Sequence, residues 1–303
     1  MNRTNRSVCL IILAFSCILI FGCSRKDTNE SIRTAEPETP QAEHTPSVFL
    51  PSADGVVTYG NASAAIDASH SSEGYIMVRS AGAGEEVKLL ISGPDQKEYT
   101  YFLSDSGDFE PFPLVCGSGT YQIQVQKKTA DDTYASLFTQ SMDAKMEEAY
   151  IPFLYPNQYV KFTATSKAIL KGSELAANTS SDLEVLQNVY QFITENITCG
   201  IEKAADLSYS YLPDIDETFE SGTGNCFDLA AVMTAILRSQ KIPAKLETGY
   251  GNETLHVWIS AYLQETGWAE QIICFDGTAW VLQDPGTPAD TQEMKDMKMT
   301  FTY

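Results

Sequence analysis

Apolar and polar residues alternate in short runs between residues 47 and 146. Residues 121–126 alternate tyrosine, isoleucine and valine with glutamine, a period of two that places one strand face in a core and the other in water. Similar runs, separated by turn-forming glycine, proline and aspartate, lie at 75–78, 87–91, 99–103 and 134–138. Short strands at this spacing predict a β-sandwich over residues 47–146. His70, which lies among serines, is interpreted as a surface loop residue.

The pattern changes to helical spacing further along the chain. An aromatic stretch at 150–162 is interpreted as the seam between two domains. Apolar residues then repeat at intervals of three and four, which predicts an amphipathic helix from 182 to about 196. Ser181 and Glu184 have capping-box spacing at its start. Residues 202–224 are predicted to form a long loop, either the rim of a cleft or a solvated loop.

A second helical pattern begins directly at a cysteine. Asn225 is a good N-cap, Asp228 stands three residues later, and apolar residues keep helical spacing through Ser239. Cys226 is therefore expected in the first turn. A thiol attacks only as a thiolate, and its pKa is expected to fall at a helix N-terminus, where unpaired N–H groups and the helix dipole favour negative charge.

Strand-like runs follow that helix. They cover residues 242–249, 256–263, 271–275 and 279–283. An antiparallel sheet built from them can bring His256 over Cys226 and place Asp284 beside the imidazole. A nucleophile, a base and a carboxylate that orients the base form a thiol acyl-transfer triad. Asp276 competes as the orienting acid, but the Asp-Gly pair that it begins already explains it as hairpin-turn chemistry.

Each member of this triad also has a structural interpretation. A lone cysteine early in a helix is more often part of a core than a catalyst. A histidine before a tryptophan can pack within a strand, and an aspartate before a proline can be a turn former. The joint order and context of the three residues favour catalysis. The predicted fold class is α+β, an N-terminal β-sandwich followed by a domain at 147–303 in which the Cys226 helix packs on an antiparallel sheet.

The N-terminus predicts export. Residues 1–23 contain two arginines, a short apolar core and a small residue before Cys23, as in a signal peptide. The end of this segment resembles a bacterial lipobox, which makes Cys23 the predicted lipidation site; the alternative is an uncleaved N-terminal anchor. Residues 24–46 are polar and proline-bearing and are predicted to be a disordered tether. We expect an extracytoplasmic protein, attached to the bacterial membrane through lipid on Cys23.

The net charge and the cysteine positions limit the classes of partner and cofactor that the protein is expected to bind. The formal net charge is −20, with no lysine- or arginine-rich run, which argues against nucleic-acid binding. Basic partners are compatible with this acidity, but solubility explains it as well. Beyond the N-terminal segment, Cys116, Cys199 and Cys274 accompany Cys226. We interpret those three as small buried hydrophobes, and one disulfide among them stays open. No metal or other cofactor is expected, because no Cys-x-x-Cys or His-x-x-x-His pattern occurs.

Residues 180–285 resemble the core of the transglutaminase-like superfamily. The matching motifs lie at 224–226 with its following helix, 235–244, 256–258 and 280–285. The resemblance implies a papain-like thiol mechanism on peptide or protein amides. In it, Cys226 attacks a carboxamide carbon, His256 carries the proton and Asp284 holds the imidazole tautomer. It also resembles exported clostridial lipoproteins that join such a domain to a β-rich one.

Three functions are compatible with these patterns. The first is an exported, lipid-anchored thiol enzyme that works through a thioacyl-enzyme, as a cysteine protease or amidase or by transglutaminase-type acyl transfer. The second is a catalytically inactive cell-surface binding or assembly protein that uses the β-sandwich. The third is a redox protein with paired cysteines, although no cysteine pair has a redox-motif spacing.

Overall fold

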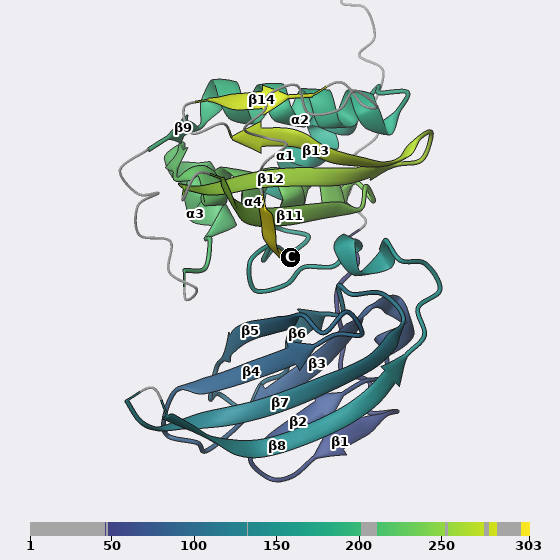
Figure 1. The fold of residues 1–303 in the computed structure, drawn as a ribbon. Helices are drawn as coiled ribbons and strands as arrows, with labels where there is room; N and C mark the ends of the chain where they lie inside the picture. The colour runs from purple at the N-terminus through teal and green to yellow at the C-terminus, as the bar shows by residue number, and fades with distance from the viewer. Residues whose placement is uncertain are drawn as a thin grey trace, which may run out of the picture. The chain divides into compact units, whose positions relative to one another are not determined.

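The N-terminal part of the described structure is a β-sandwich (Figure 1). The structure is a computed structural model, and it describes residues 46, 48–131, 133–200, 211–251, 254–275, 279–283 and 298–303. One antiparallel sheet has the order β1-β2-β3-β6, with β1 Thr58–Gly60, β2 Ala64–Asp67, β3 Tyr75–Ser80 and β6 Glu110–Pro113. The other has the order β5-β4-β7-β8, with β5 Glu98–Leu103, β4 Val87–Ser92, β7 Gly119–Ala130 and β8 Thr133–Ala144.

The alternation in the sequence explains this sandwich. In β7 the side chains of Tyr121, Ile123 and Val125 are fully buried, whereas the intervening glutamines lie at or near the surface. Inward-facing residues of both sheets form one core. In it the rings of Tyr101 and Phe112, which come from opposite sheets, pack edge to face with centroids 5.1 Å apart. The predicted sandwich is confirmed, since each sheet buries one face against the other.

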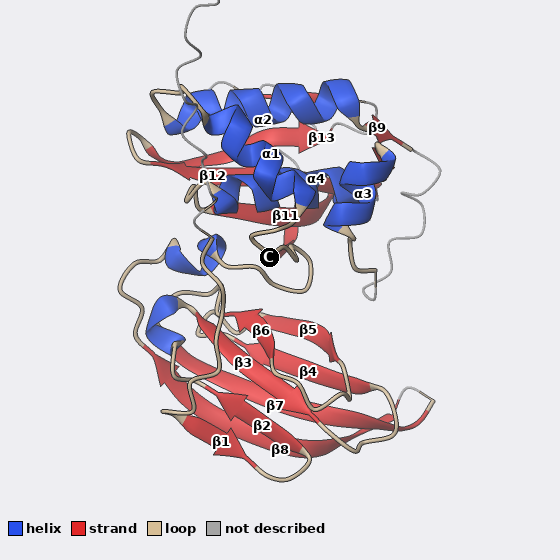
Figure 2. Ribbon diagram, turned by 180° about the vertical axis from the view of Figure 1, so that it is seen from behind, coloured by secondary structure: helices blue, strands red, loops and turns tan. Residues whose placement is uncertain are grey.

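The described residues that follow form an α+β unit with four helices and a five-stranded antiparallel sheet. The helices are α1 Lys167–Ala176, α2 Asp182–Asn196, α3 Ile215–Ser221 and α4 Cys226–Ser239. The sheet order is β14-β13-β12-β11-β15, with β14 Trp280–Leu282, β13 Gly267–Phe275, β12 Thr254–Leu263, β11 Ala244–Gly251 and β15 Lys298–Thr302. The helices cover one face of this sheet, as Figure 2 shows from the helical side. Two short 3-10 helices, η1 Ser71–Glu73 and η2 Ile151–Leu154, and a two-residue parallel pair, β9 Thr198–Cys199 with β10 Thr223–Gly224, complete the described elements.

Helix α4 is the centre of the α+β unit. All its residues are buried, and it contacts the other three helices as well as β11 and β12. A helix that is apolar all round belongs in a core. Arg238, in its last turn, is fully buried and donates to the main-chain oxygens of Ala244 at 3.0 Å, Tyr155 at 2.7 Å and Tyr303 at 2.7 Å. These bonds join the end of α4 to three other segments of the chain.

Local signals predicted some elements well and others poorly. Helices α2 and α4 begin at the predicted caps, and α2 ends at Asn196 as expected. The predicted loop at 202–224 was wrong in part, because Asp214 caps the helix α3 there. Helix α1 and the edge strand β15 were not predicted; β15 owes its place to pairing with β11.

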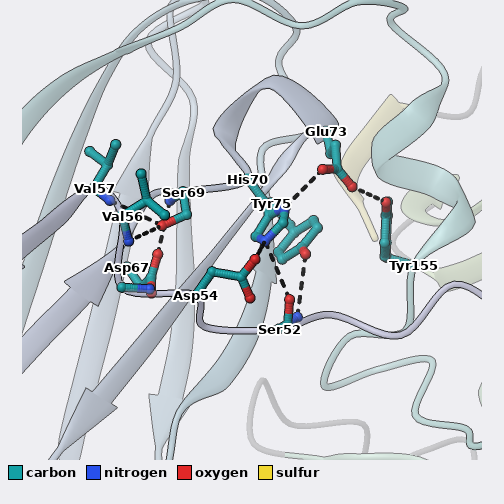
Figure 3. A network of polar contacts seen from close by, with 11 residues as sticks. Ser52, Asp54, Val56, Val57, Asp67, Ser69, His70, Glu73, Tyr75 and Tyr155 are labelled. Atoms are coloured by element: carbon teal, nitrogen blue, oxygen red, sulfur yellow. Dashed lines mark hydrogen bonds and ion pairs between the residues drawn. The ribbon is translucent and has the colours of Figure 1, made fainter.

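The surroundings of His70 differ in part from the sequence prediction (Figure 3). His70 lies in a turn as predicted, at the N-cap position of η1 but without a side-chain cap bond, and its side chain is half-buried rather than freely exposed at the surface. Its Nδ1 lies 2.7 Å from Oε1 of Glu73 and its Nε2 lies 3.0 Å from Oδ2 of Asp54. Tyr155 donates to the other oxygen of Glu73 at 2.5 Å, and the imidazole stacks on Tyr75 at 5.2 Å. We call His70, Asp54, Glu73, Tyr75 and Tyr155 the His70 cluster.

Candidate functional site

Cys226 is the first residue of α4, and the cap that starts this helix is complete. The side chain of Asn225 accepts from the backbone N–H of Asp228 at 2.9 Å, and the Asp228 carboxylate accepts from the backbone N–H of Asn225 at 2.9 Å. Gly224 is required just before it. A Cβ at that position would lie 2.8 Å from Cβ of Asp228 and 2.9 Å from Cγ2 of Thr218. The glycine therefore lets the turn approach the helix closely.

The topology carries Cys226 and His256 to the same end of the sheet. Four residues connect the end of α4 to the start of β11, where Arg238 bonds to Ala244. Strand β11 runs back along the helix, so its end lies where α4 begins. Strand β12 starts at that end, and His256 near its beginning pairs with Gly249 of β11. Helix α4 packs against both strands.

The imidazole of His256 is buried and incompletely bonded. The residue is 3% exposed, and its Nε2 has no hydrogen-bond partner within the described parts of the chain. Most buried polar atoms in proteins are satisfied, and an unmet one costs about 1–3 kcal/mol. A free ring nitrogen is also what a general base needs in order to accept a proton.

The strand that carries His256 is held by a buried carboxylate. Glu247 of β11 accepts from the indole N–H of Trp258 at 2.9 Å and from the hydroxyl of Ser260 at 2.5 Å. Burial raises the pKa of Glu247 above its ordinary value, against the hydrogen bond from Ser260 and the charge of Lys245. These bonds fix β12 at positions two and four residues beyond His256.

The thiol of Cys226 does not have the lowered pKa that its helical position predicted. Cys226 is 3% exposed, and burial raises its pKa to about 12. The nearby thiol of Cys199 and the carboxylate of Asp228 raise it further, whereas the N–H groups of Phe227 and Cys226 lower it. The expected helix-terminus effect is present, but desolvation outweighs it.

Sequence reasoning missed two neighbours of the nucleophile. Tyr211 donates to the carboxylate of Asp228 at 2.5 Å, and its ring lies 6.4 Å from that of Phe227. Cys199 pairs with Gly224 through the β9–β10 bridge, two residues before Cys226. Asp228 was predicted only as a cap. Tyr211 belongs to the segment 202–224 that was interpreted as either the rim of a cleft or a solvated loop, but no local pattern paired it with Asp228.

The predicted orienting acid Asp284 lies outside the described residues, as does its competitor Asp276. Cys116, Cys199, Cys226 and Cys274 are all free. Cys274 is buried as predicted, whereas Cys116 and Cys199 are only half-buried. Across the described ranges, no three His, Cys, Asp or Glu side chains are grouped so as to hold a metal ion. No helix in the same ranges is long and apolar enough to span a membrane.

The family comparison agrees with this unit. Residues 171–271 match the family model of the transglutaminase-like superfamily. The match covers α2, α3, α4, β11 and β12, so it includes Cys226 and His256. The resemblance identified from the sequence motifs is confirmed over that segment, and the chain contains a transglutaminase-like domain.

Two solved structures are similar to the chain at low identity. A candidate cysteine protease from Cytophaga hutchinsonii is 15% identical with a TM-score of 0.39, over 82% of this chain and 78% of that one. A candidate protease from Parabacteroides distasonis is 10% identical with a TM-score of 0.29, over 73% of this chain and 63% of that one. No curated protein matches the chain at a significant level.

Proposed function

We propose that the protein is a thiol enzyme that acts on peptide or protein amides through a thioacyl-enzyme. The observation that carries this proposal is the unpartnered, buried Nε2 of His256, at the end of the sheet where α4 begins with Cys226. The transglutaminase-like domain at 171–271 supports the same chemistry. Asp284 would hold the imidazole in the tautomer that accepts at Nε2.

The raised pKa of Cys226 shapes the proposed mechanism. The resting nucleophile is a neutral thiol at pH 7, so deprotonation accompanies attack. As the Sγ–C bond forms at the amide carbon, the thiol proton passes to Nε2 of His256. The C–N bond then breaks, and the imidazolium returns that proton to the leaving amine. Water or an acceptor amine resolves the thioester, with His256 as base, and regenerates the thiol.

The cellular setting belongs to the same proposal. We infer export through residues 1–23, lipid attachment at Cys23 and a tether over 24–46, from the apolar and polar pattern of that region. Hydrolysis is favoured over amine transfer, because water is abundant and no sequence feature marks an amine site.

A second function is favoured by one observation, the near-complete burial and high pKa of the Cys226 thiol. An inert cysteine in a packed helix would have these properties, and the working part would then be the β-sandwich as a cell-surface binding or assembly module. The same experiment separates the two functions.

The test is turnover of a defined peptide library by the full chain and by Cys226→Ala. Mass spectrometry would detect new carboxyl termini from hydrolysis and, with cadaverine present, amine conjugates from transfer. Cys274→Ala is the matched control, since Cys274 is an equally buried free cysteine on β13. We expect products with the parent chain and Cys274→Ala and none with Cys226→Ala. Retained turnover in Cys226→Ala would refute the thiol mechanism.

A further inference from the structure

A pocket of about 410 Å³ lies beside the candidate site. Its walls include Tyr250 of β11, Met299 and Phe301 of β15, and Lys97 and Tyr99. Most of its lining is apolar, and this volume is within the range of small-molecule and side-chain sites. We call it the Tyr250–Met299 pocket.

The strand register sets its distance from His256. Gly249 pairs with His256 on one side and with Met299 on the other. Neighbouring strands lie about 4.8 Å apart, so the main chain at Met299 is roughly 10 Å from that at His256. An extended peptide advances about 3.3 Å per residue. Two or three substrate residues therefore bridge the reacting carbonyl and the pocket.

A series of rings connects the pocket to the residue after the nucleophile. The ring centroids of Tyr99 and Phe301 are 5.8 Å apart, and those of Phe301 and Tyr303, which are stacked, are 6.1 Å apart. The ring centroid of Tyr303 lies 6.3 Å from that of Phe227. Phe227 directly follows Cys226 in α4. The pocket wall and the start of α4 therefore belong to one continuous apolar packing, which favours a shape that is formed before a ligand binds.

The exposure of its walls is unusual for this part of the fold. Over the described residues from 147 onward, only four large hydrophobic side chains are exposed: Leu170, Leu212, Tyr250 and Met299. Two of them line this pocket, with Tyr250 47% and Met299 38% exposed. Apolar surface held open in a concave site is stabilised when a ligand covers it.

We propose that the Tyr250–Met299 pocket is a specificity subsite for a large apolar side chain of a peptide substrate, two or three residues from the reacting carbonyl. This inference rests on the proposed function and names the substrate class for it. The subsite selects leucine, methionine or phenylalanine over alanine or a charged residue, because only the larger apolar side chains displace water from its walls.

The test uses epoxysuccinyl peptides, which carry residues on both sides of an electrophilic carbon. Attack forms an Sγ–C bond and opens the epoxide C–O bond, and the oxygen takes up a proton. Each probe carries either phenylalanine or alanine at the second and third residues on both sides. The rate of labelling at Cys226 is followed by mass spectrometry of the full chain, with Cys226→Ala to identify reaction at other cysteines.

We expect the phenylalanine probe to label Cys226 at least about tenfold faster than the alanine probe. Met299→Gln, which keeps side-chain length and adds polarity, and Tyr250→Ala should each reduce that preference to less than about threefold. Leu170→Ala, which removes an exposed apolar side chain from α1, should leave it unchanged.

The outcomes separate this inference from the function that it extends. Labelling of Cys226 at equal rates by both probes, or a preference that survives both pocket variants, overturns the subsite and leaves the thiol enzyme standing. Failure of every probe to label Cys226 overturns the proposed function and the subsite with it. Two pocket variants are used, so that a folding defect in one does not decide the result.

Discussion

The two described histidines occupy opposite electrostatic settings. His70 lies between two carboxylates, so both of its ring nitrogens have partners. His256 is more deeply buried and leaves Nε2 without a partner in the described structure. Hydrogen bonds to Glu73 and Asp54 raise the pKa of His70 against burial, which stabilises its charged form. The first arrangement gains stability from a satisfied ion cluster, whereas the second leaves a buried ring nitrogen without a hydrogen bond.

The difference separates structural from functional polar groups. A partly exposed ion cluster such as that of His70 costs little to desolvate and adds modestly to stability. A buried imidazole nitrogen without a partner lowers the folding stability by about 1–3 kcal/mol, and the surrounding packing does not offset this loss. The thiol of Cys226 carries no such cost at rest, because burial raises its pKa and keeps it neutral. A buried polar atom that the protein itself leaves without a partner is a candidate for a role in function.

The largest expected effect is on activity, and it tests whether the two histidines differ in role. His256→Ala should lower turnover by about 10²–10⁴-fold, because it removes the proton acceptor from the attack step. His70→Ala should leave turnover within about twofold, because the His70 cluster contains no residue of the proposed reaction. The measurement is kcat/KM on the best substrate from the peptide library. Equal losses in the two variants would show that the histidines differ in burial but not in role.

The next effect concerns the protonation of Cys226. Iodoacetamide is small and covers no substrate-binding surface, so its rate reports the resting thiol. With the pKa raised to about 12, labelling at pH 7.5 should be at least about 100-fold slower than for an exposed thiol, and it should keep rising above pH 9. Labelling that levels off near neutral pH, and that His256→Ala abolishes, would instead reveal a preformed thiolate–imidazolium pair.

A smaller effect tests how tightly the start of α4 is packed. Gly224→Ala places a Cβ within 3 Å of Asp228 and Thr218, and such overpacking destabilises by about 1–3 kcal/mol. Thermal unfolding should show a decrease in Tm of roughly 2–4 °C for each kcal/mol. Gly200→Ala is the control, one residue beyond β9, where the added Cβ meets only the Gly224 carbonyl at 3.7 Å. Similar losses in both variants would contradict the role assigned to Gly224.

The smallest expected effect is the dependence of folding stability on pH that the His70 cluster produces. The pKa of His70 is raised in the folded state. The free energy that His70 contributes to folding is therefore fully present below its unfolded pKa of about 6.5, and it is lost as pH rises through the folded pKa. Burial raises the pKa of Glu73, but hydrogen bonds from Tyr155 and His70 lower it overall. The pKa of Asp54 is lowered too, mainly by a hydrogen bond from Ser52. Burial raises the pKa of Asp67, but hydrogen bonds from Ser69 and Gly55 lower it overall. The contribution of these acids disappears as pH falls below about 4.

We therefore expect His70→Ala to reduce Tm at pH 5.5 by roughly 2–4 °C and to have less effect at pH 9. Paired thermal melts of the parent and variant across pH 4 to 9 measure the difference directly. Glu73→Gln, which keeps the shape and removes the charge, is the matched control and should reproduce most of the loss. A difference in Tm that does not vary with pH would mean that His70 acts only through packing.

Local sequence features predicted the elements that depend on neighbours along the chain. The periods of two and of three to four gave β7, α2 and α4, because side-chain direction follows from backbone geometry within a single element. The reciprocal cap of Asn225 and Asp228 was predictable for the same reason, since both partners lie within four residues. The helix-to-strand order was enough to expect Cys226 and His256 at one end of the sheet.

Only the tertiary structure decided the properties that depend on distant segments. The members of the His70 cluster come from positions as far apart as Asp54 and Tyr155, and no local pattern indicates that they meet. The pKa of Cys226 departs from its sequence prediction because desolvation depends on the atoms that surround the thiol, whereas the helix dipole depends on the helix alone. Sequence periodicity sets which way a side chain points, but solvent exclusion and long-range pairing arise when separate elements pack together.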